Sequence, residues 1–316
     1  MPPAAALPAP LPAPARREWL VASGVVAAAC LVALWTLRTY WNPLFFFGLW
    51  TGATVFVRAA SGQRPWPWRR QLALMALSAP LWWWFELVNE TVQNWHYHGV
   101  VAYDDNAYLL FATLAFSTVA PALDAAWTAA LHWWPERPTT VSQVPVRLPS
   151  PAGRGAGGEG AAPAAHSTHG ASPELPRTAS LALIATGLFW QAAVFLWPTY
   201  AYSFTWTAPF LVFDGLASIT GGVSLVACLW RRQWRLPLAI AAGGLACGFC
   251  WEFWNFWAMP KWTYTVPHLQ FLQVFEMPLL GYGGYVPFAW SAYQVVALCE
   301  RAIAALRRTT GQQPDR

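Results

Sequence analysis

The chain has 316 residues, of which 56% are hydrophobic and only 10% are charged, with a mean hydropathy of +0.33. Soluble globular domains carry charge on about a quarter of their residues, so this composition excludes an ordinary soluble domain and indicates a polytopic membrane protein. The net charge of +5 does not indicate nucleic-acid binding, because basic residues do not alternate with aromatic residues as such a surface requires.

Eight apolar stretches follow one another along the chain, each close to the roughly 20 residues that a helix needs to cross a bilayer. We expect spans at about 19–37, 43–60, 71–89, 107–131, 179–199, 205–229, 236–258 and 284–306. The segments outside them are a Pro/Ala-rich tail at 1–18, expected to be disordered, a flexible linker at 133–178 and a tail at 307–316. The predicted fold class is therefore an all-α membrane helix bundle, with membrane segments at 19–132 and 179–306.

Basic residues are distributed asymmetrically around these spans. With eight spans, 17 of the 19 Lys and Arg residues fall on one side, and only Arg38 and Lys261 fall on the other. The positive-inside rule then predicts that both termini and the linker are cytoplasmic. We expect an integral protein of a bacterial cytoplasmic membrane, with membrane lipids as its immediate partners.

The two membrane segments also resemble each other. A shift of 166 residues superimposes charged and amide residues at identical spacing, which is harder to obtain by chance than matched Ala or Leu. Each segment holds an even number of spans, so we expect two parallel four-helix repeats. The matched pairs are Pro43 and Pro209, Thr54 and Thr220, Arg69 and Arg235, Glu86 and Glu252, Asn89 and Asn255, and, after one added residue, Trp95 and Trp262, and Tyr97 and Tyr264.

The last apolar run is interrupted near 270–284. Pro278 removes a backbone donor, and the glycines of Gly281-Tyr282-Gly283-Gly284 allow sharp turns. Such breaks are tolerated at membrane depth only where protein or a cavity satisfies the backbone. We expect a short half-helix or re-entrant segment that carries Glu276 inward.

Four acidic residues are the candidate catalytic groups, because an ionisable residue within a membrane span is costly and indicates a function. The predicted topology places all four in the outer half of the bilayer. Glu86 and Glu252 each lie three residues before an asparagine, on the same helix face as that asparagine. The four candidates are Glu86, Glu252, Glu276 and Asp214.

Amide and aromatic side chains around these acids are the candidate substrate-binding groups. They are Asn89, Asn255, Trp251, Trp254, Trp262, Tyr264 and Tyr282. Asn89 and Asn255 occupy the position where a di-iron bundle would carry histidine, so we expect neither a metal nor another cofactor.

Three functions are compatible with this pattern. A neutral carboxylic acid among aromatic faces can protonate an alkene and stabilise the cation, which predicts an enzyme acting on an isoprenoid, carotenoid or other lipid, with a hydrophobic small molecule as substrate. Parallel repeats with intramembrane acids also suit a proton-coupled transporter or channel. The third possibility is a non-catalytic membrane scaffold, in which the acids form a structural polar cluster that holds the halves together. The sequence does not indicate an oligomeric state.

Overall fold

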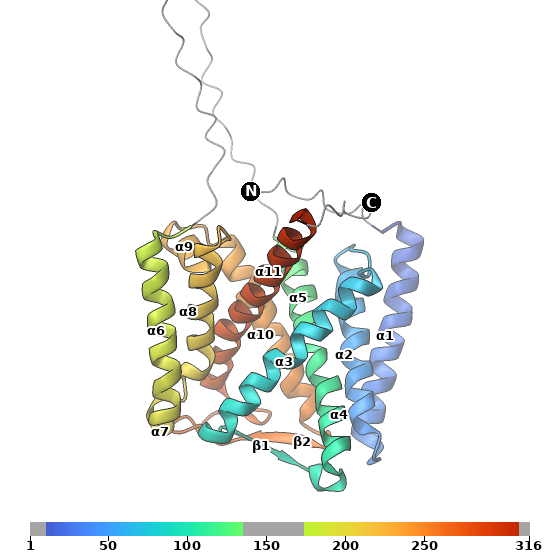
Figure 1. Cartoon of the computed structure of the whole chain (residues 1–316). Coiled ribbons are helices and arrows are strands. Elements are labelled where there is room, and N and C mark those ends of the chain that lie inside the picture. The colour runs from blue at the N-terminus through green and yellow to red at the C-terminus, as the bar shows by residue number, and fades with distance from the viewer. Residues whose placement is uncertain (1–10, 135–173, 310–316) are drawn as a thin grey trace, which may run out of the picture.

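A computed structural model describes residues 11–134 and 174–309, and most of these residues are helical (Figure 1). The longer helices are α1 (Ala13–Thr36), α2 (Asn42–Ala60), α3 (Trp68–Val92), α4 (Asp105–Ser117), α5 (Val119–Trp133), α6 (Arg177–Leu196), α8 (Phe204–Ile219), α10 (Arg235–Asn255) and α11 (Tyr285–Thr309). The short elements are α7 (Pro198–Ala201), α9 (Leu225–Trp230), the 3-10 helices η1 (Val100–Ala102) and η2 (Leu279–Gly284), and the strands β1 (Trp95–His98), β2 (Lys261–Tyr264), β3 (Gln273–Val274) and β4 (Met277–Pro278). The predicted all-α bundle is confirmed.

Five segments of the described chain are long and apolar enough to cross a membrane. They are α1, α2, α6, α10, and α4 together with α5 (Asp105–Trp133). Helix α8 is apolar but shorter, and α3 and α11 are long without reaching the same hydropathy. Helices occupy all eight predicted apolar stretches, while the number of spans stays a prediction.

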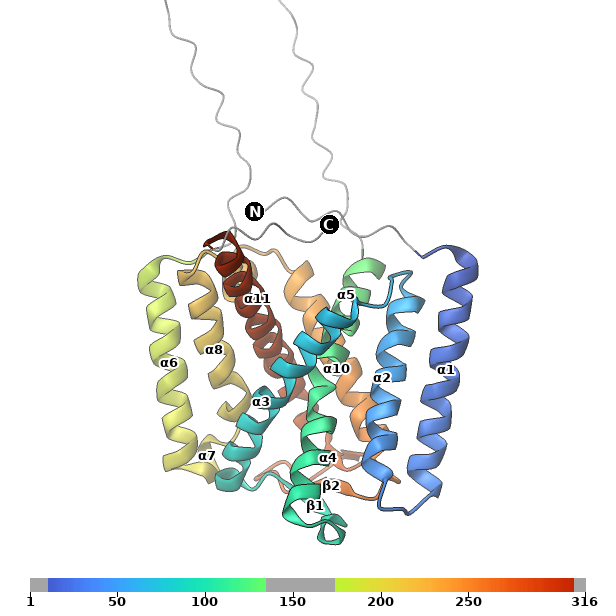
Figure 2. The ribbon, with the colours of Figure 1, turned by 45° about the vertical axis from the view of Figure 1, so that its right-hand side comes forward.

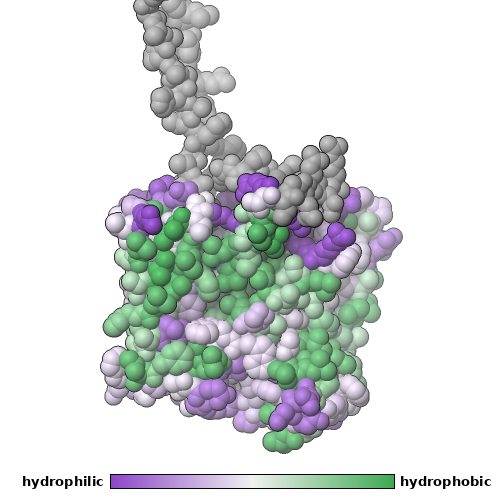
Figure 3. All heavy atoms as spheres, viewed as in Figure 1, coloured by the Kyte–Doolittle hydropathy of each residue, from purple (hydrophilic) through white to green (hydrophobic). Residues whose placement is uncertain are grey.

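On the face of the bundle seen in Figure 3, many apolar side chains gather between hydrophilic groups at the upper and lower ends. On α6, Leu188, Phe189 and Leu196 are 58%, 65% and 64% exposed. Exposed apolar surface of this kind is costly in water, and it suits contact with the hydrocarbon core of a bilayer. These helices are therefore suited to an integral membrane protein.

The two described termini of the chain lie at the same end of the bundle. The start of α1 and the end of α11 are at one end of the bundle, which we call the terminal end (Figures 1 and 2). The paired strands β1 and β2 close the opposite end, which we call the ribbon end. Helix α10 packs against α5 and α11, and α11 also packs against α8. The helices of the two predicted halves are thus interleaved.

Proline and glycine residues determine several helix boundaries. Pro12, Pro67 and Pro176 directly precede α1, α3 and α6, since proline needs no helical donor at that position. Gly221 has φ +74°, which glycine adopts without steric cost, and it stands just after the end of α8. The span predicted at 205–229 is therefore wrong as a single helix, because the chain breaks there into α8 and α9.

Some predicted segments fall partly outside the described residues. In the tail predicted at 1–18, residues 13–18 are the start of α1, and residues 1–10 lie outside the described chain. Most of the linker predicted at 133–178 also lies outside it. Of the tail predicted at 307–316, residues 307–309 are the end of α11 and the remainder is outside.

The segment near 270–284 is irregular, as expected, but it does not contain a half-helix. Strands β3 and β4 form a short antiparallel hairpin, and η2 then leads into α11. Leu272 and Phe275 have φ values of 51° and 57°, which a right-handed helix cannot include. These two backbone conformations explain why the predicted half-helix does not form in this segment.

Candidate functional site

The β1–β2 ribbon carries four aromatic side chains on one face. The strands are antiparallel, with Trp95 opposite Tyr264 and Tyr97 opposite Trp262. Alternate residues of a strand point to the same side, so these four rings share a face. His96, His98, Lys261 and Thr263 occupy the other face, where His98 Nε2 lies 2.8 Å from Thr263 Oγ1.

Two asparagines at the ends of α3 and α10 hold the strands in place. Asn89 donates through Nδ2 to the carbonyl of Trp95 (2.8 Å) and accepts from the backbone N–H groups of Asn94 and Trp95. Asn255, which is fully buried, donates to the carbonyl of Trp262 (2.7 Å) and accepts from its N–H (2.9 Å). Both predicted substrate-binding asparagines are therefore occupied with the backbone of the ribbon.

Glu86 of α3 is surrounded by hydrogen-bond donors. Its Oε1 accepts from Tyr97 Oη at 2.6 Å, from Trp82 Nε1 at 2.7 Å and from Trp95 Nε1 at 3.3 Å. Trp82 lies one helical turn before Glu86, and the other two donors come from the ribbon. One carboxyl group thus connects α3 to two residues of β1, Trp95 and Tyr97.

Glu252 of α10 has a similar but smaller set of partners. Its Oε1 accepts from Tyr264 Oη and from Tyr285 Oη, both at 2.7 Å. Trp262 Nε1 donates to Tyr264 Oη at 2.9 Å, which fixes the orientation of that hydroxyl. Glu252 is 0% exposed, and its Oε2 has no hydrogen-bond partner in the described structure.

A cavity of about 430 Å³ lies between the ribbon and the ends of the helices. The four ribbon aromatics line it together with Trp82, Trp206, Trp251, Tyr285 and Phe288. No charged side chain and no histidine is among the described residues that line it. The cavity has the size and the largely apolar lining of a site for a small organic molecule.

The tyrosines of the ribbon remain hydrogen-bond donors. Burial raises the pKa of Tyr97 and of Tyr264 well above its ordinary value, and the adjacent glutamate raises each pKa further. Both phenols therefore keep their protons at neutral pH, which agrees with their donation to Glu86 and Glu252. Tyr97, Tyr264 and Tyr285 bring polar hydroxyls to a cavity whose described lining is mostly apolar. The other polar residues of the lining are Asn42, Asn94, Tyr103, Tyr108, Tyr202, Ser203 and Thr207.

The structure places the predicted aromatic residues in two groups. Trp251, Trp262 and Tyr264 line the cavity. Trp254 does not, because it packs against Trp50 with ring centroids 4.4 Å apart. Tyr282 also lies outside the lining, and its hydroxyl donates to the carbonyl of Val274 at 3.2 Å.

The four predicted acids do not share one site. Glu86 and Glu252 lie behind the cavity wall, where tyrosines and tryptophans separate them from the cavity. Glu276 stands at the turn of the β3–β4 hairpin and forms an ion pair with Lys261. The prediction that Glu276 points inward with the others is corrected by this ion pair, which holds the turn against the start of β2.

Asp214 is a structural acid. Its carboxylate accepts from Ser224 Oγ (2.6 Å), from the N–H of Leu225 (2.6 Å) and from Gln294 Nε2 (2.6 Å). It therefore satisfies the first N–H groups of α9, at the terminal end of the bundle (Figure 1). Its predicted place beside Glu86 and Glu252 is wrong, because the break after α8 turns α9 back onto it.

The large aromatic side chains that line the cavity without having been predicted as site residues include Trp82, Trp206, Tyr285 and Phe288. Trp82 could have been found, since it precedes Glu86 by four residues on one helix face. Trp206 stacks on Phe85 and on Trp95, with ring centroids 4.9 and 5.7 Å apart. No local pattern indicates that contact, because it joins α8 to α3 and β1.

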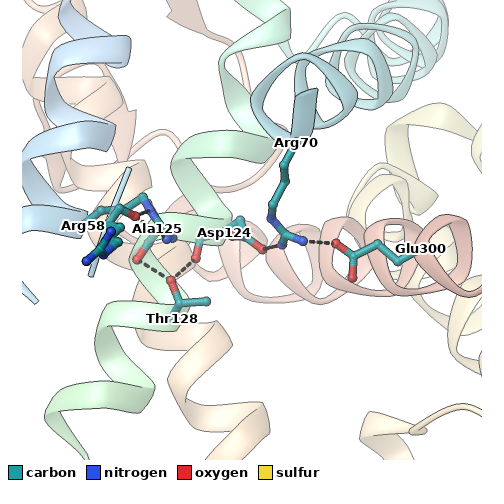
Figure 4. Close-up of polar contacts among 7 residues, drawn as sticks. Arg58, Arg70, Asp124, Ala125, Thr128 and Glu300 are labelled. Atoms are coloured by element: carbon teal, nitrogen blue, oxygen red, sulfur yellow. Dashed lines mark hydrogen bonds and ion pairs between the residues drawn. The ribbon is translucent and has the colours of Figure 1, made fainter. Parts of the chain in front are cut away.

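A separate charged cluster joins three helices near the terminal end (Figure 4). Arg70 of α3 contacts Asp124 of α5 at 3.4 Å and Glu300 of α11 at 2.5 Å. Thr128 Oγ1 donates to the backbone carbonyl of Asp124 at 2.6 Å. Asp124 is 3% exposed, so Arg70 compensates a buried carboxylate that the sequence did not single out.

No group of three or more His, Cys, Asp or Glu side chains in the described ranges is arranged to hold a metal ion. No protein-family model, no curated protein and no solved structure matches this chain. The geometry of the cavity is thus the only basis for a functional inference.

Proposed function

We propose that the chain is a membrane-embedded enzyme that acts on an isoprenoid, carotenoid or other lipid by acid catalysis in the aromatic cavity. The observation that carries this proposal is the lining itself, a largely apolar cavity in which three tyrosines are hydrogen-bonded to Glu86 and to the fully buried Glu252. A hydrocarbon fits the apolar wall, and among the described lining residues the groups that can give it a proton are hydroxyls and not carboxyl groups.

The chemistry follows from the distribution of polar groups. Aromatic faces attract positive charge, so Trp82, Trp251 and Phe288 can stabilise a cation formed on the substrate. Tyr97, Tyr264 and Tyr285 are in position to exchange a proton with it. Glu86 and Glu252 act through these tyrosines and are positioning residues, which replaces the expectation that a glutamate itself contacts the substrate.

We further propose an orientation of the chain in the membrane and an origin of its two membrane segments by duplication. The two terminal helix ends face the cytoplasm, which places the ribbon and the cavity in the outer half of the membrane. The Glu86–Tyr97 and Glu252–Tyr264 contacts are what a duplicated segment would retain, so we propose a repeat relating the two membrane segments. Both statements are supported by residue spacing and charge distribution.

The test compares membrane lipids and pigments extracted from cells that express the chain. Tyr285→Phe and Glu252→Gln remove the hydroxyl and the acid of one pair, and we expect both to abolish the product found with the unaltered protein. Glu90→Gln and Tyr200→Phe remove an exposed acid and an exposed hydroxyl away from the cavity and should leave the product unchanged. Product formation at full level by both cavity variants would refute acid catalysis.

A proton-coupled transporter is the second candidate. Buried acids occur at both ends of the bundle, Glu252 near the ribbon and Asp124 near the terminal end, as a proton path would require. Reconstituted vesicles with and without a pH gradient separate the two functions. Uptake of a lipid-soluble probe that depends on the gradient would favour transport, and uptake that ignores the gradient would eliminate proton coupling.

A further inference from the structure

We propose that the two glutamates hold different protonation states, with Glu252 a neutral acid that delivers its proton through Tyr285 and Glu86 a carboxylate that stabilises the cation. This division of roles rests on the proposed function for its chemistry. Its evidence, however, is the hydrogen bonding of the two groups and can be tested without a substrate.

The hydrogen-bond partners of Glu86 are donors, so the carboxyl oxygens of Glu86 must accept hydrogen bonds. Two of its three donors are indole N–H groups, which can donate but cannot accept. The third, Tyr97, donates at 2.6 Å. Trp95 Nε1 also lies 3.4 Å from Oε2, so both oxygens have a donor. A carboxylate solvated by these dipoles needs no cation beside it.

The hydrogen-bond partners of Glu252 can also accept, so Glu252 itself can be a protonated donor. Its two short hydrogen bonds, both 2.7 Å long, come from phenolic hydroxyls, which can donate or accept, and both reach the same oxygen, Oε1. An anion here would leave Oε2 buried and without a hydrogen bond, which is costly. A neutral acid with its proton on Oε1 leaves Oε2 as a carbonyl oxygen, the less costly group to bury unpaired.

The two tyrosines at Glu252 are not equivalent. Tyr264 Oη accepts from Trp262 Nε1, so its own proton is directed to Glu252. Tyr285 Oη lies 2.7 Å from Glu252 Oε1 and lines the cavity, so it can accept the Glu252 proton and turn its own proton to the cavity. Tyr285 is therefore the hydroxyl that touches the substrate in this scheme.

The surrounding charged groups leave this assignment intact. On the Glu252 side, Lys261 is paired with Glu276, and the Tyr282 hydroxyl is bound to Val274. On the Glu86 side, the nearest titratable groups besides its hydrogen-bond partner are Glu90 of α3 and Tyr108 of α4. No ion pair to either glutamate occurs in the described part of the chain.

The proton transfer is balanced without an oxidant. The Tyr285 O–H bond breaks as its proton adds to an alkene carbon, and the π electrons of the alkene form the new C–H bond. The Glu252 proton moves to the Tyr285 oxygen, which leaves a carbocation on the substrate and a carboxylate at Glu252. Loss of a neighbouring C–H proton, or addition of water with release of one proton, returns that proton to Glu252. The class of reaction is thus isomerisation, cyclisation or hydration of an unsaturated lipid.

Infrared spectroscopy of the full chain in lipid nanodiscs tests the assignment. A neutral carboxylic acid has a carbonyl stretch separate from that of a carboxylate, and this band shifts in D₂O. We expect Glu252→Gln to remove such a band at neutral pH, and both Glu86→Gln and the exposed control Glu90→Gln to retain it. Loss of the band in Glu86→Gln, or a band unaffected by Glu252→Gln, would overturn the proposal.

A second variant covers the case in which Glu252→Gln does not fold. Tyr285→Phe retains the acid and removes one hydrogen bond to it, so the carbonyl band should remain and move in frequency. A band that does not move contradicts the Glu252–Tyr285 link. In the lipid assay, loss of the acid should lower the rate by about 10²–10⁴-fold, the usual contribution of general acid catalysis. If the infrared bands behave as expected but no lipid product is found, the proposed enzymatic function is refuted. The assignment of protonation states to Glu252 and Glu86 is then retained.

Discussion

Tyr97 and Trp262 lie opposite each other in the β1–β2 ribbon, although 165 positions separate them in the chain. Tyr97 donates to Glu86, and Trp262 donates to the tyrosine that binds Glu252. Cross-strand neighbours of this kind contact each other directly, so the pair joins the two acidic segments at the floor of the cavity. The ribbon has only four residues in each strand, and its register decides which aromatic rings face the cavity.

Replacing Asn255 by alanine should loosen the ribbon. The change leaves the N–H and the carbonyl of Trp262 without their partner in a partly buried place, which costs up to about 1–3 kcal/mol for each group. We expect a lower midpoint of thermal unfolding in detergent and loss of the lipid product. Asn106→Ala, at an exposed position of α4, is the matched control and should keep the midpoint of the unaltered protein. Equal midpoints for the two variants would show that Asn255 does not hold the strand.

Stability should fall at high pH because of the ribbon tyrosines. The pKa of Tyr97 and of Tyr264 is raised in the folded chain, chiefly by burial, while an unfolded tyrosine titrates at about 10. Above that pH the unfolded chain binds fewer protons than the folded chain, so the stabilisation present at neutral pH is lost as the pH rises. Thermal midpoints measured from pH about 8 to about 11 should decrease, and Tyr264→Phe should flatten the decrease. An exposed substitution, Tyr200→Phe, should follow the unaltered protein.

Gly248→Ala should displace Tyr285 from Glu252. A Cβ atom at position 248 would lie 2.3 Å from Tyr285 Cδ2, which the packed ring cannot accommodate without moving. Overpacking of this kind costs about 1–3 kcal/mol, and here it also breaks the Tyr285–Glu252 hydrogen bond. We expect lower thermal stability and loss of product in the lipid assay.

The control for that variant is Gly24→Ala in α1. There a Cβ atom would lie 3.5 Å from Phe56, an ordinary contact, and alanine favours the helix by up to about 1 kcal/mol. This variant should be as stable as the unaltered protein or slightly more stable. If both glycine variants have the same thermal stability and the same amount of lipid product, crowding of Tyr285 does not explain the effect of Gly248→Ala.

The Lys261–Glu276 ion pair should stabilise the hairpin through a measurable coupling. Both side chains are 21% exposed, so solvent screens the pair only in part. We expect Glu276→Gln and Lys261→Met each to lower the thermal midpoint, and the double variant to lower it by less than the sum, with a coupling of about 1 kcal/mol. Added salt should reduce the coupling. Strictly additive effects would mean that the two charges do not stabilise each other.

Part of the site follows from local spacing. A carboxyl group and an amide three residues apart on one helix face, followed by an aromatic strand, predict that Glu86 with Tyr97 and Glu252 with Tyr264 belong to one region. The hydrogen bonds between those residues are present. Trp82 was within reach of the same reasoning, because helical period places it beside Glu86.

Other parts were not accessible to such reasoning. Asp214 is an acid within an apolar stretch of the sequence like Glu86 and Glu252, and only the fold of α9 reveals that its partners are Ser224 and Leu225. Tyr285 reaches Glu252 from 33 residues further along the chain, and Trp206 reaches the cavity from another helix. Contacts of this kind depend on how the helices cross, which a periodic pattern does not contain.

The amino-acid sequence alone determined that this is an all-α membrane bundle, where most of its helices lie and which acids stand among aromatic residues. These are local properties, since hydropathy over about 20 residues and a period of 3.6 are set by neighbours in the chain. The tertiary structure decided that tyrosines, and not glutamates, line the cavity, and that Asp214 and Glu276 lie outside it. Those outcomes depend on the register of two strands and on partners from distant helices, because a buried carboxyl group is satisfied by whichever donors the fold brings to it.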